Sequence, residues 1–151
     1  MKTDTGLNIQ NLTFTIREFR ISELSMNIQR SEYFVLSGAN GAGKTVLIKL
    51  ITGLLRPVSG TIQINGRDIT RTPPWERNIG YVPQDSALFP NRTVAGNIGF
   101  GLEVREKDRH VRKKEIARIA EFMGISRLLE RTPQGLSGGE RQKVSIARAL
   151  V

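Results

Sequence analysis

The stretch from Gly38 to Thr45 constrains the fold of this chain more than any other. Its sequence, GANGAGKT, matches the pattern G-x-x-x-x-G-K-[ST] in full. The apolar run from Tyr33 to Leu36 precedes it and predicts a buried strand, and helical periodicity follows from about Gly43. Strand, glycine-rich loop and helix in this order are the context that a phosphate-binding loop requires. The alternative, a glycine-rich turn with a chance lysine, explains neither flank.

The motif predicts a site for a nucleoside triphosphate. Its glycines let backbone N–H groups turn toward phosphate oxygens, and the helix N-terminus adds partial positive charge. Lys44 would bring a full charge to the outer phosphates, and the hydroxyl of Thr45 would ligate Mg²⁺. The predicted nucleotide contacts are Gly38, Ala39, Asn40, Gly41, Ala42, Gly43, Lys44, Thr45 and Val46.

Bulk composition sets limits on class and compartment. With 151 residues of which 38% are hydrophobic, the chain can form one domain with a core, and no apolar run is long enough to span a bilayer. There is no cysteine, which excludes disulfides and thiolate metal sites, and the start lacks signal-peptide organisation, so a cytoplasmic setting is expected. The net charge of +9 fits nucleic acid, an anionic membrane surface or a polyphosphate ligand, and does not choose among them.

Short elements surround the motif. Apolar and polar residues alternate from Leu7 to Leu12 and from Phe19 to Ile28, which predicts two antiparallel strands with Arg17-Glu18 as their turn. Thr61 to Ile64, followed by Asn65-Gly66, predicts a strand that runs into a hairpin turn. The helix after the motif would pack on this sheet through an apolar stripe at helical spacing: Leu47, Leu50, Ile51 and Leu54.

The chain changes character after a further predicted strand, Ile79 to Val82. Gln84 follows that strand, at a position where binding residues commonly project. Thr93 could cap a helix over residues 94–100, and a second apolar stripe, Ile116, Ile119, Ala120 and Met123, predicts another. The basic stretch 105–114 fits a nucleic-acid footprint, but its interspersed acidic residues favour a solvated helix face, with His110 on the surface.

A second motif runs from Leu136 to Gln142. Ser137 and Glu140 form the pattern of a capping box, so a helix should begin here. Gly138 and Gly139 leave the backbone N–H groups of its first turn uncovered, which suits an anion. In isolation the pattern more often marks an ordinary capped helix.

Together the two motifs resemble one family, the ATP-binding subunits of ABC transporters. Gly38 to Thr45 is similar to the family's Walker A motif, Gln84 to its Q-loop glutamine, and Leu136 to Glu140 to its LSGGE signature, in the same order. The resemblance implies an α/β fold: a P-loop NTPase with a RecA-like core and N-terminal antiparallel strands, plus a helical signature subdomain, here incomplete. Residues 1–90 would form the nucleotide-binding core and residues 91–151 the helical subdomain.

The resemblance also implies a mechanism with ATP and Mg²⁺. Two subunits would close head to tail, so that Ser137, Gly138, Gly139 and Glu140 act on the partner's ATP. Lys44 and Gln84 would be the catalytic residues, with Thr45 and Gln84 near the metal. Leu88, Phe89 and the segment 94–100 would receive a membrane permease, linked indirectly to a solute-binding protein, although ordinary burial explains Leu88 and Phe89 equally well. The subunit would lie on the inner face of the membrane.

Two departures from the family pattern affect activity. The chain reaches Val151 within the signature helix, before the family's Walker B carboxylates and switch histidine, and His110 is not that histidine. We therefore expect the 151 residues to bind nucleotide without hydrolysing it, and to be poorly soluble or molten. Ile16 occupies the position of the family's adenine-stacking aromatic residue, with Phe14 and Phe19 as neighbours.

The cargo is the least constrained property. Several stretches, including Glu32 to Leu36 and Asp68 to Thr70, are similar to molybdate and tungstate importers, which implies an oxyanion; other oxyanions or metal ions are the nearest substitutes. A soluble ABC ATPase that acts on nucleic acid or the ribosome is the rival suggested by the charge. The DNA-repair members carry a long coiled coil between the motifs, and this chain has no sustained heptads there. We expect no nucleic-acid partner.

Overall fold

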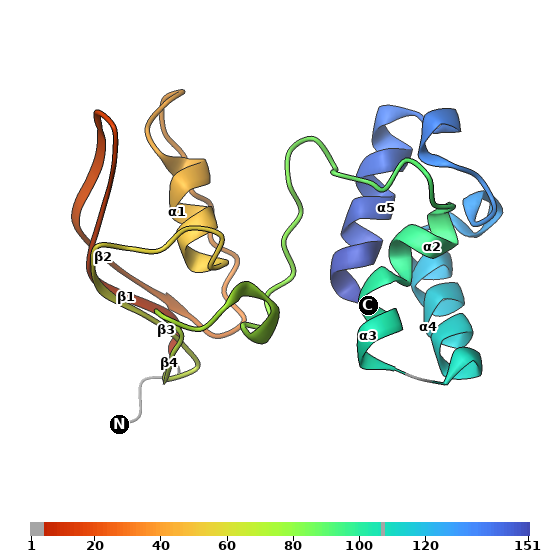
Figure 1. Ribbon diagram of the computed structural model, residues 1–151, viewed down its shortest axis with the longest axis horizontal. Helices are drawn as coiled ribbons and strands as arrows, with labels where there is room; N and C mark the ends of the chain where they lie inside the picture. Colours follow the sequence, from red (N-terminus) through yellow and green to blue (C-terminus); the bar gives the residue numbers. More distant parts are fainter. Residues whose placement is uncertain (1–4, 107) are drawn as a thin grey trace. The chain divides into compact units, whose positions relative to one another are not determined.

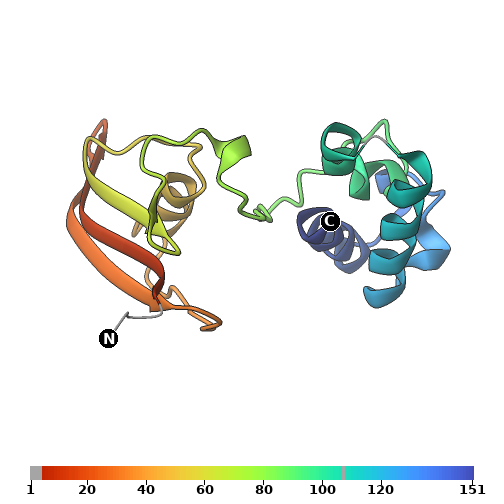
Figure 2. The ribbon, with the colours of Figure 1, turned by 90° about the horizontal axis from the view of Figure 1, so that it is seen from below.

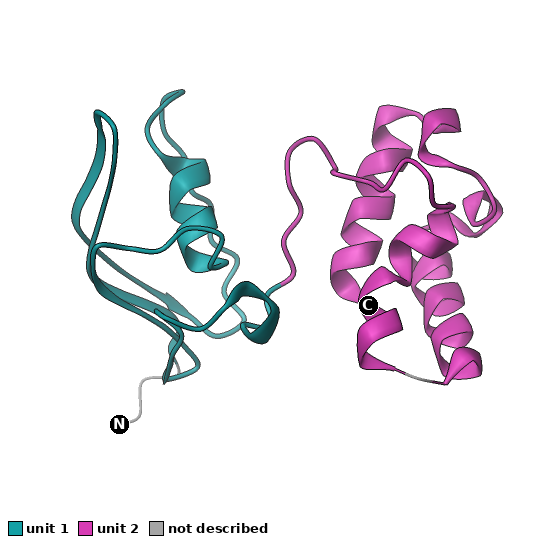
Figure 3. Cartoon of the chain, viewed as in Figure 1, with its two compact units in different colours: residues 1–79 teal, residues 80–151 magenta. Residues whose placement is uncertain are grey.

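A computed structural model describes residues 5–106 and 108–151, which fall into two compact units, Met1–Ile79 and Gly80–Val151 (Figure 3). Unit 1 contains all the described strands and the helix after the glycine-rich loop. The functional division into residues 1–90 and 91–151 remains a prediction. The elements of unit 1 are β1 (Thr5–Ile16), β2 (Phe19–Gln29), α1 (Lys44–Ile51), β3 (Ser59–Ile64), β4 (Arg67–Asp68) and the 3₁₀ turn η1 (Pro74–Glu76).

The strands of unit 1 form an antiparallel sheet in the order β2-β1-β3-β4. One face of the sheet is covered by α1 (Figures 1 and 2). The core between them joins Ile9, Leu12 and Ile62 of the sheet to Leu47 and Leu50 of the helix, all of them buried. The predicted packing of the loop helix on a sheet is confirmed, because the apolar stripe of α1 and the inward residues of β1 share one cluster.

Both predicted hairpins are present. Arg17 takes a positive φ of 51° in the turn that connects β1 to β2. Asn65 and Gly66 have φ values of 51° and 78° between β3 and β4. Positive φ at both central residues is the requirement of a type I′ turn, and asparagine followed by glycine meets it with little strain.

Two predicted strands are wrong. Residues 33–36 and 79–82 adopt no strand, and the side chains of Tyr33 and Val35 are 92% and 68% exposed. A strand is defined by hydrogen bonds to a neighbour, and no strand of the described residues pairs with either segment. An apolar run indicates that a segment favours burial in a sheet, but the segment forms a strand only where another strand lies beside it.

Unit 2 is helical. Its elements are α2 (Val94–Ile98), α3 (Phe100–Arg105), α4 (Arg109–Phe122), the 3₁₀ turns η2 (Ser126–Leu128) and η3 (Pro133–Gly135), and α5 (Gly138–Leu150). Its buried core joins Val94 and Ile98 of α2, Ile119 of α4 and Val144 of α5. The predicted helix starts at Thr93 and Ser137 are confirmed, because each side chain accepts a hydrogen bond from the third residue beyond it. Within residues 5–106 and 108–151, no helix combines the length and the apolar character needed to cross a membrane.

Candidate functional site

Two glycines of the glycine-rich loop take left-handed backbone conformations. Gly41 and Gly43 have φ values of 82° and 89°, a region that only glycine enters without strain. These two residues turn the chain into α1, whose N-terminus carries no side-chain cap from the described residues. The first N–H groups of a helix have no partner within it, so they face out of the loop with the positive end of the helix dipole. This arrangement suits an anion.

Lys44 adds a full charge to the same place. Its Nζ donates to the carbonyl oxygens of Gly38 and Ala39, at 2.6 and 2.7 Å. The ammonium group therefore lies over the loop, six residues back along the chain, instead of extending away from the helix. Thr45 is exposed one position further along α1, whereas Val46 is half-buried and packs against the core of unit 1. The loop residues from Gly38 to Ala42 are exposed.

The remaining predicted nucleotide residues occupy different places. Gln84 is exposed and belongs to unit 2, whereas the loop belongs to unit 1, so its role remains a prediction. Ile16 is 49% exposed at the β1–β2 turn, and Phe14 is buried in the core. His110 is exposed at the start of α4, as predicted. Among the described residues, no group of three or more His, Cys, Asp or Glu could hold a metal ion.

The second motif forms the predicted capping box at the start of α5. The Ser137 hydroxyl accepts from the N–H of Glu140 at 3.3 Å, and the Glu140 carboxylate accepts from the N–H of Ser137 at 2.9 Å. Two hydrogen bonds from Ser137 lower the pKa of Glu140, and the one from the backbone N–H has a larger effect than the one from the hydroxyl. The carboxylate is therefore charged at neutral pH and fixes the first turn of the helix.

Gly138 and Gly139 are not required by the fold. Both are exposed, and a Cβ added at either position would meet no atom of the described residues within 4 Å. Neither has a positive φ. Glycine in a helix costs about 0.5–1 kcal/mol relative to alanine, so two bare positions at this N-terminus fit close approach by something outside the subunit.

The surface predicted to receive a permease contains an aromatic and cationic cluster. The Phe89 and Phe100 rings lie 4.5 Å apart between centroids, and the guanidinium of Arg92 lies over Phe100 at 5.0 Å. Leu88 and Phe89 are half-buried, and Leu88 packs against the core of unit 2. Asn97 fixes the chain here: its amide accepts from the Phe89 N–H and donates to the Phe89 carbonyl. Burial and a docking role are compatible at this surface.

Arg77 is a structural residue that the sequence patterns missed. It is only 5% exposed, and its guanidinium donates to the carbonyls of Leu50 and Ile51 at the end of α1 and of Thr70 and Thr72. It therefore ties the helix that carries the loop to the chain that follows β4. No local pattern marks such an arginine, because its partners at the end of α1 lie 27 and 26 residues away in the sequence.

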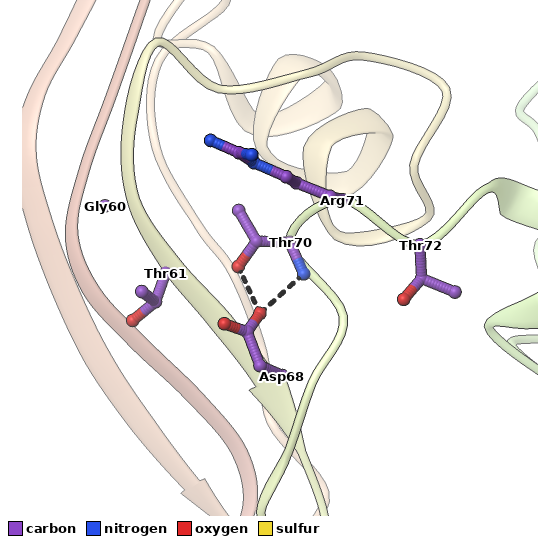
Figure 4. A pocket seen from close by; sticks show the side chains of 6 residues that line it. All are labelled: Gly60, Thr61, Asp68, Thr70, Arg71 and Thr72. Carbon is purple, nitrogen blue, oxygen red and sulfur yellow. Dashed lines mark hydrogen bonds between the residues drawn. The ribbon is translucent and has the colours of Figure 1, made fainter.

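A cavity of about 700 Å³ lies elsewhere in unit 1 (Figure 4). The hydroxyl and backbone N–H of Thr70 donate to the Asp68 carboxylate, and these bonds lower its pKa. None of the predicted site residues lines this cavity. Its lining is Gly60, Thr61, Asp68, Thr70, Arg71 and Thr72.

Comparison with known proteins agrees with the motifs. A family model described as ABC transporter matches residues 21–151. The chain is 48% identical over 145 residues to the molybdate/tungstate import ATP-binding protein WtpC of Methanocaldococcus jannaschii, covering 96% of this chain and 48% of that protein. It is 44% identical over 145 residues to WtpC of Pyrococcus abyssi, covering 96% and 42%. The sulfate/thiosulfate import ATP-binding protein CysA of Mycobacterium tuberculosis is 44% identical over 115 residues, covering 76% and 33%.

A solved structure shows the same fold. CbiO1 from Clostridium perfringens, described as part of the ABC transporter complex cbiONQ, superposes with a TM-score of 0.85 at 28% identity, covering 97% of this chain and 61% of that one. The predicted fold class is confirmed: an α/β P-loop NTPase with antiparallel N-terminal strands and a helical subdomain. The chain spans less than half the length of the three curated relatives named above.

Proposed function

Because the chain belongs to the ABC transporter family, we propose that it is the ATP-binding part of an importer, in which ATP binding and hydrolysis drive solute uptake. The observation that carries the proposal is the loop of unit 1. Two glycines with positive φ, an uncapped helix start and the ammonium of Lys44 converge on one exposed loop. This arrangement supports the binding of a polyphosphate.

The loop would hold ATP together with Mg²⁺. The N–H groups around Gly41 and Gly43 would bind the inner phosphates, and Lys44 would exchange the carbonyls of Gly38 and Ala39 for oxygens of the outer phosphates. The exposed hydroxyl of Thr45 fits a hard cation with oxygen ligands. The metal would supply further charge neutralisation during phosphoryl transfer.

The signature helix would act on the nucleotide of a second copy. The capped and exposed N-terminus of α5, with Gly138 and Gly139 free of steric contact, supports close approach to a partner's phosphates in a head-to-tail dimer. Gln84 would contact the metal and the attacking water. The surface around Leu88, Phe89 and residues 94–100 would dock on permease subunits. The protein would then lie on the cytoplasmic face of the membrane and would be linked through the permease to a solute-binding protein.

Hydrolysis would need residues outside this chain. The sequence contains no Asp-Glu pair after an apolar run, which is the arrangement expected of Walker B carboxylates. We therefore propose that residues 1–151 bind nucleotide but do not turn it over.

For the cargo we propose a tetrahedral oxyanion, molybdate or tungstate first, since the WtpC relatives align over nearly the whole chain. Sulfate is the second candidate, supported by the CysA relative.

Binding of Mg²⁺-ATP by the purified protein tests the site. Lys44→Ala should weaken binding at least tenfold, because it removes a charge-assisted contact to phosphate. Lys49→Ala is the matched control, since this lysine also belongs to α1 but is exposed in its last turn. Equal affinity of the Lys44→Ala and Lys49→Ala variants would contradict the proposed site. Steady phosphate release by residues 1–151 would contradict the proposed need for outside residues.

A further inference from the structure

Two arginines line one cavity of unit 1. The cavity measures about 500 Å³, and its wall runs from Arg56 to Gly60 and includes Thr70 and Arg71. It adjoins the cavity of Figure 4, because Gly60, Thr70 and Arg71 line both. In Figure 4 the Arg71 side chain extends toward β3, away from that of Thr72. None of the residues predicted to bind nucleotide lines either cavity.

Hydrogen bonds to the sheet hold both arginine-bearing segments in place. The N–H of Val58 donates to the carbonyl of Thr13 at 2.8 Å, which ties the segment with the first arginine to β1. The N–H of Ile62 donates to the Thr70 hydroxyl at 2.8 Å, which ties the segment with the second arginine to β3. Both segments are therefore anchored to neighbouring strands of one sheet.

Neither guanidinium is neutralised by a protein group. Among residues 5–106 and 108–151, the side chains of Arg56 and Arg71 make no hydrogen bond and no ion pair. Asp68 lines the adjoining cavity, but its carboxylate accepts from the hydroxyl and N–H of Thr70, and Arg71 has the smallest of the influences on its pKa. Two cationic groups with unused N–H donors therefore line a single cavity.

We propose that this cavity binds a tetrahedral oxyanion, either free or as the phosphate group of a larger molecule. A guanidinium presents paired N–H donors that match two oxygens of such an anion, and two guanidiniums can hold one dianion between them. The hydroxyl of Ser59 lines the same cavity and can donate a further hydrogen bond. Donors from three directions suit four tetrahedral oxygens better than the two oxygens of a planar carboxylate.

The size of the cavity admits both sources of the anion. A water molecule occupies about 30 Å³ in the liquid, so a small oxyanion fills only part of the space and a phosphate ester also fits. The proposal does not depend on the ATP site. Lys44 lies over the carbonyls of Gly38 and Ala39, and none of these residues lines the cavity.

Calorimetric titration at constant ionic strength, with inorganic phosphate and with phenyl phosphate, tests the site. The protein is a longer one in which residues 33–36 are buried, and it carries Lys44→Ala, which weakens the glycine-rich loop as a competing phosphate site. Arg56→Met and Arg71→Met should each weaken both probes at least tenfold, because each removes charge-assisted hydrogen bonds. Arg67→Met is the matched control, since this exposed arginine of β4 lines neither cavity; it should change either affinity by less than about twofold.

The two probes distinguish the sources. Tighter binding of phenyl phosphate would identify a phosphate ester as the ligand, and tighter binding of inorganic phosphate a free oxyanion. No measurable binding of either probe would overturn the proposal, as would unchanged affinities in Arg56→Met and Arg71→Met. An equal loss in Arg67→Met would also overturn it, because the effect would then come from net charge alone.

Circular dichroism of every variant identifies a loss that comes from unfolding. Arg56→Lys and Arg71→Lys replace any methionine variant that unfolds, and they should still weaken both probes because lysine has no paired donors. With Lys44 intact, Arg71→Met should leave the affinity for Mg²⁺-ATP within about twofold, since the cavity is separate from the loop. Failure of the oxyanion site would therefore leave the proposed ATP site untouched.

Discussion

At the scale of single residues, Arg77 shows how a buried charge can organise an irregular segment. Its guanidinium donates to carbonyls from two parts of the chain, the end of α1 and residues 70–72. Burial lowers its pKa, yet an arginine stays protonated throughout the physiological range. A Cβ at Gly53 would overlap this guanidinium, so the glycine after α1 leaves room for it as well as ending the helix.

We expect Arg77→Met to destabilise unit 1 by about 3 kcal/mol, because it leaves buried carbonyls without a charged donor. Arg71→Met is the matched control, since Arg71 is exposed and should cost no more than about 0.5 kcal/mol. Chemical denaturation of both variants, made in a longer protein in which residues 33–36 are buried, measures the difference in unfolding free energy. Equal midpoints for the two variants would show that the four hydrogen bonds of Arg77 contribute little.

A second residue-scale prediction concerns acid. The pKa of Glu140 is lowered in the folded protein, so its contribution is fully present above the unfolded value near 4.5 and is lost as pH falls through the folded value. We expect the unsubstituted protein to lose helical circular-dichroism signal more steeply below about pH 4.5 than Glu140→Gln, whose amide oxygen keeps accepting the Ser137 N–H at every pH. Parallel curves for the two proteins between pH 7 and pH 3 would refute this role of Glu140.

At the scale of elements, sequence patterns correctly predicted the helix starts and turns that are stabilised by interactions between residues close in the sequence. The box of Ser137 and Glu140 fixes the start of α5, and Asn65-Gly66 fixes a hairpin, because the interacting groups are close in the sequence. The strand predicted for residues 33–36 failed because it depends on a partner that the described strands do not provide. The hydrogen bonds of Arg77 to the end of α1, and the contact of Phe19 with Gly43, also could not be predicted from local patterns, because each joins distant parts of the chain.

The two glycines at the start of α5 give an element-scale prediction. In a longer protein that buries residues 33–36, Gly138→Ala should stabilise the fold by up to about 1 kcal/mol, because alanine is the better helix former and meets no neighbour there. The same substitution should lower ATP hydrolysis by the assembled transporter at least tenfold if the helix start closes on a partner's phosphates. Gly101→Ala in α3 is the control, because it also faces open space but lies outside the motif.

Stability from thermal melting and hydrolysis rates from the assembled transporter should therefore change in opposite directions for Gly138→Ala. For Gly101→Ala the hydrolysis rate should not change. Full hydrolysis by the Gly138→Ala transporter would contradict the role of the signature in trans.

At the scale of the whole molecule, the apolar run at residues 33–36 departs from the usual pattern, because its side chains are exposed and not buried. Tyr33 and Val35 are largely exposed, although the pattern is that of a buried strand. Exposed apolar segments with unpaired backbone are sites of association. The relatives are more than twice as long as their matched portions, so we expect strands outside this chain to pair with the run.

We accordingly expect residues 1–151 alone to bind a hydrophobic dye and to melt without a sharp transition, whereas a longer protein should bury the run. Val35→Lys should reduce self-association of the 151-residue chain measured by light scattering, because a charge interrupts the apolar edge. Thr15→Lys is the control, an added charge at an exposed position of β1. A sharp, cooperative melt of the 151-residue monomer would refute the expectation.

The position of β1 between β2 and β3 also bears on how the protein is made. β2 follows β1 directly, so the first hairpin can close as soon as it leaves the ribosome. β3 pairs with the other edge of β1 and is synthesised only after the glycine-rich loop and α1. β1 therefore gains its second neighbour only after the glycine-rich loop and α1 have been synthesised. Completion of the sheet during synthesis is therefore a late event, and the loop is already in the chain when it occurs.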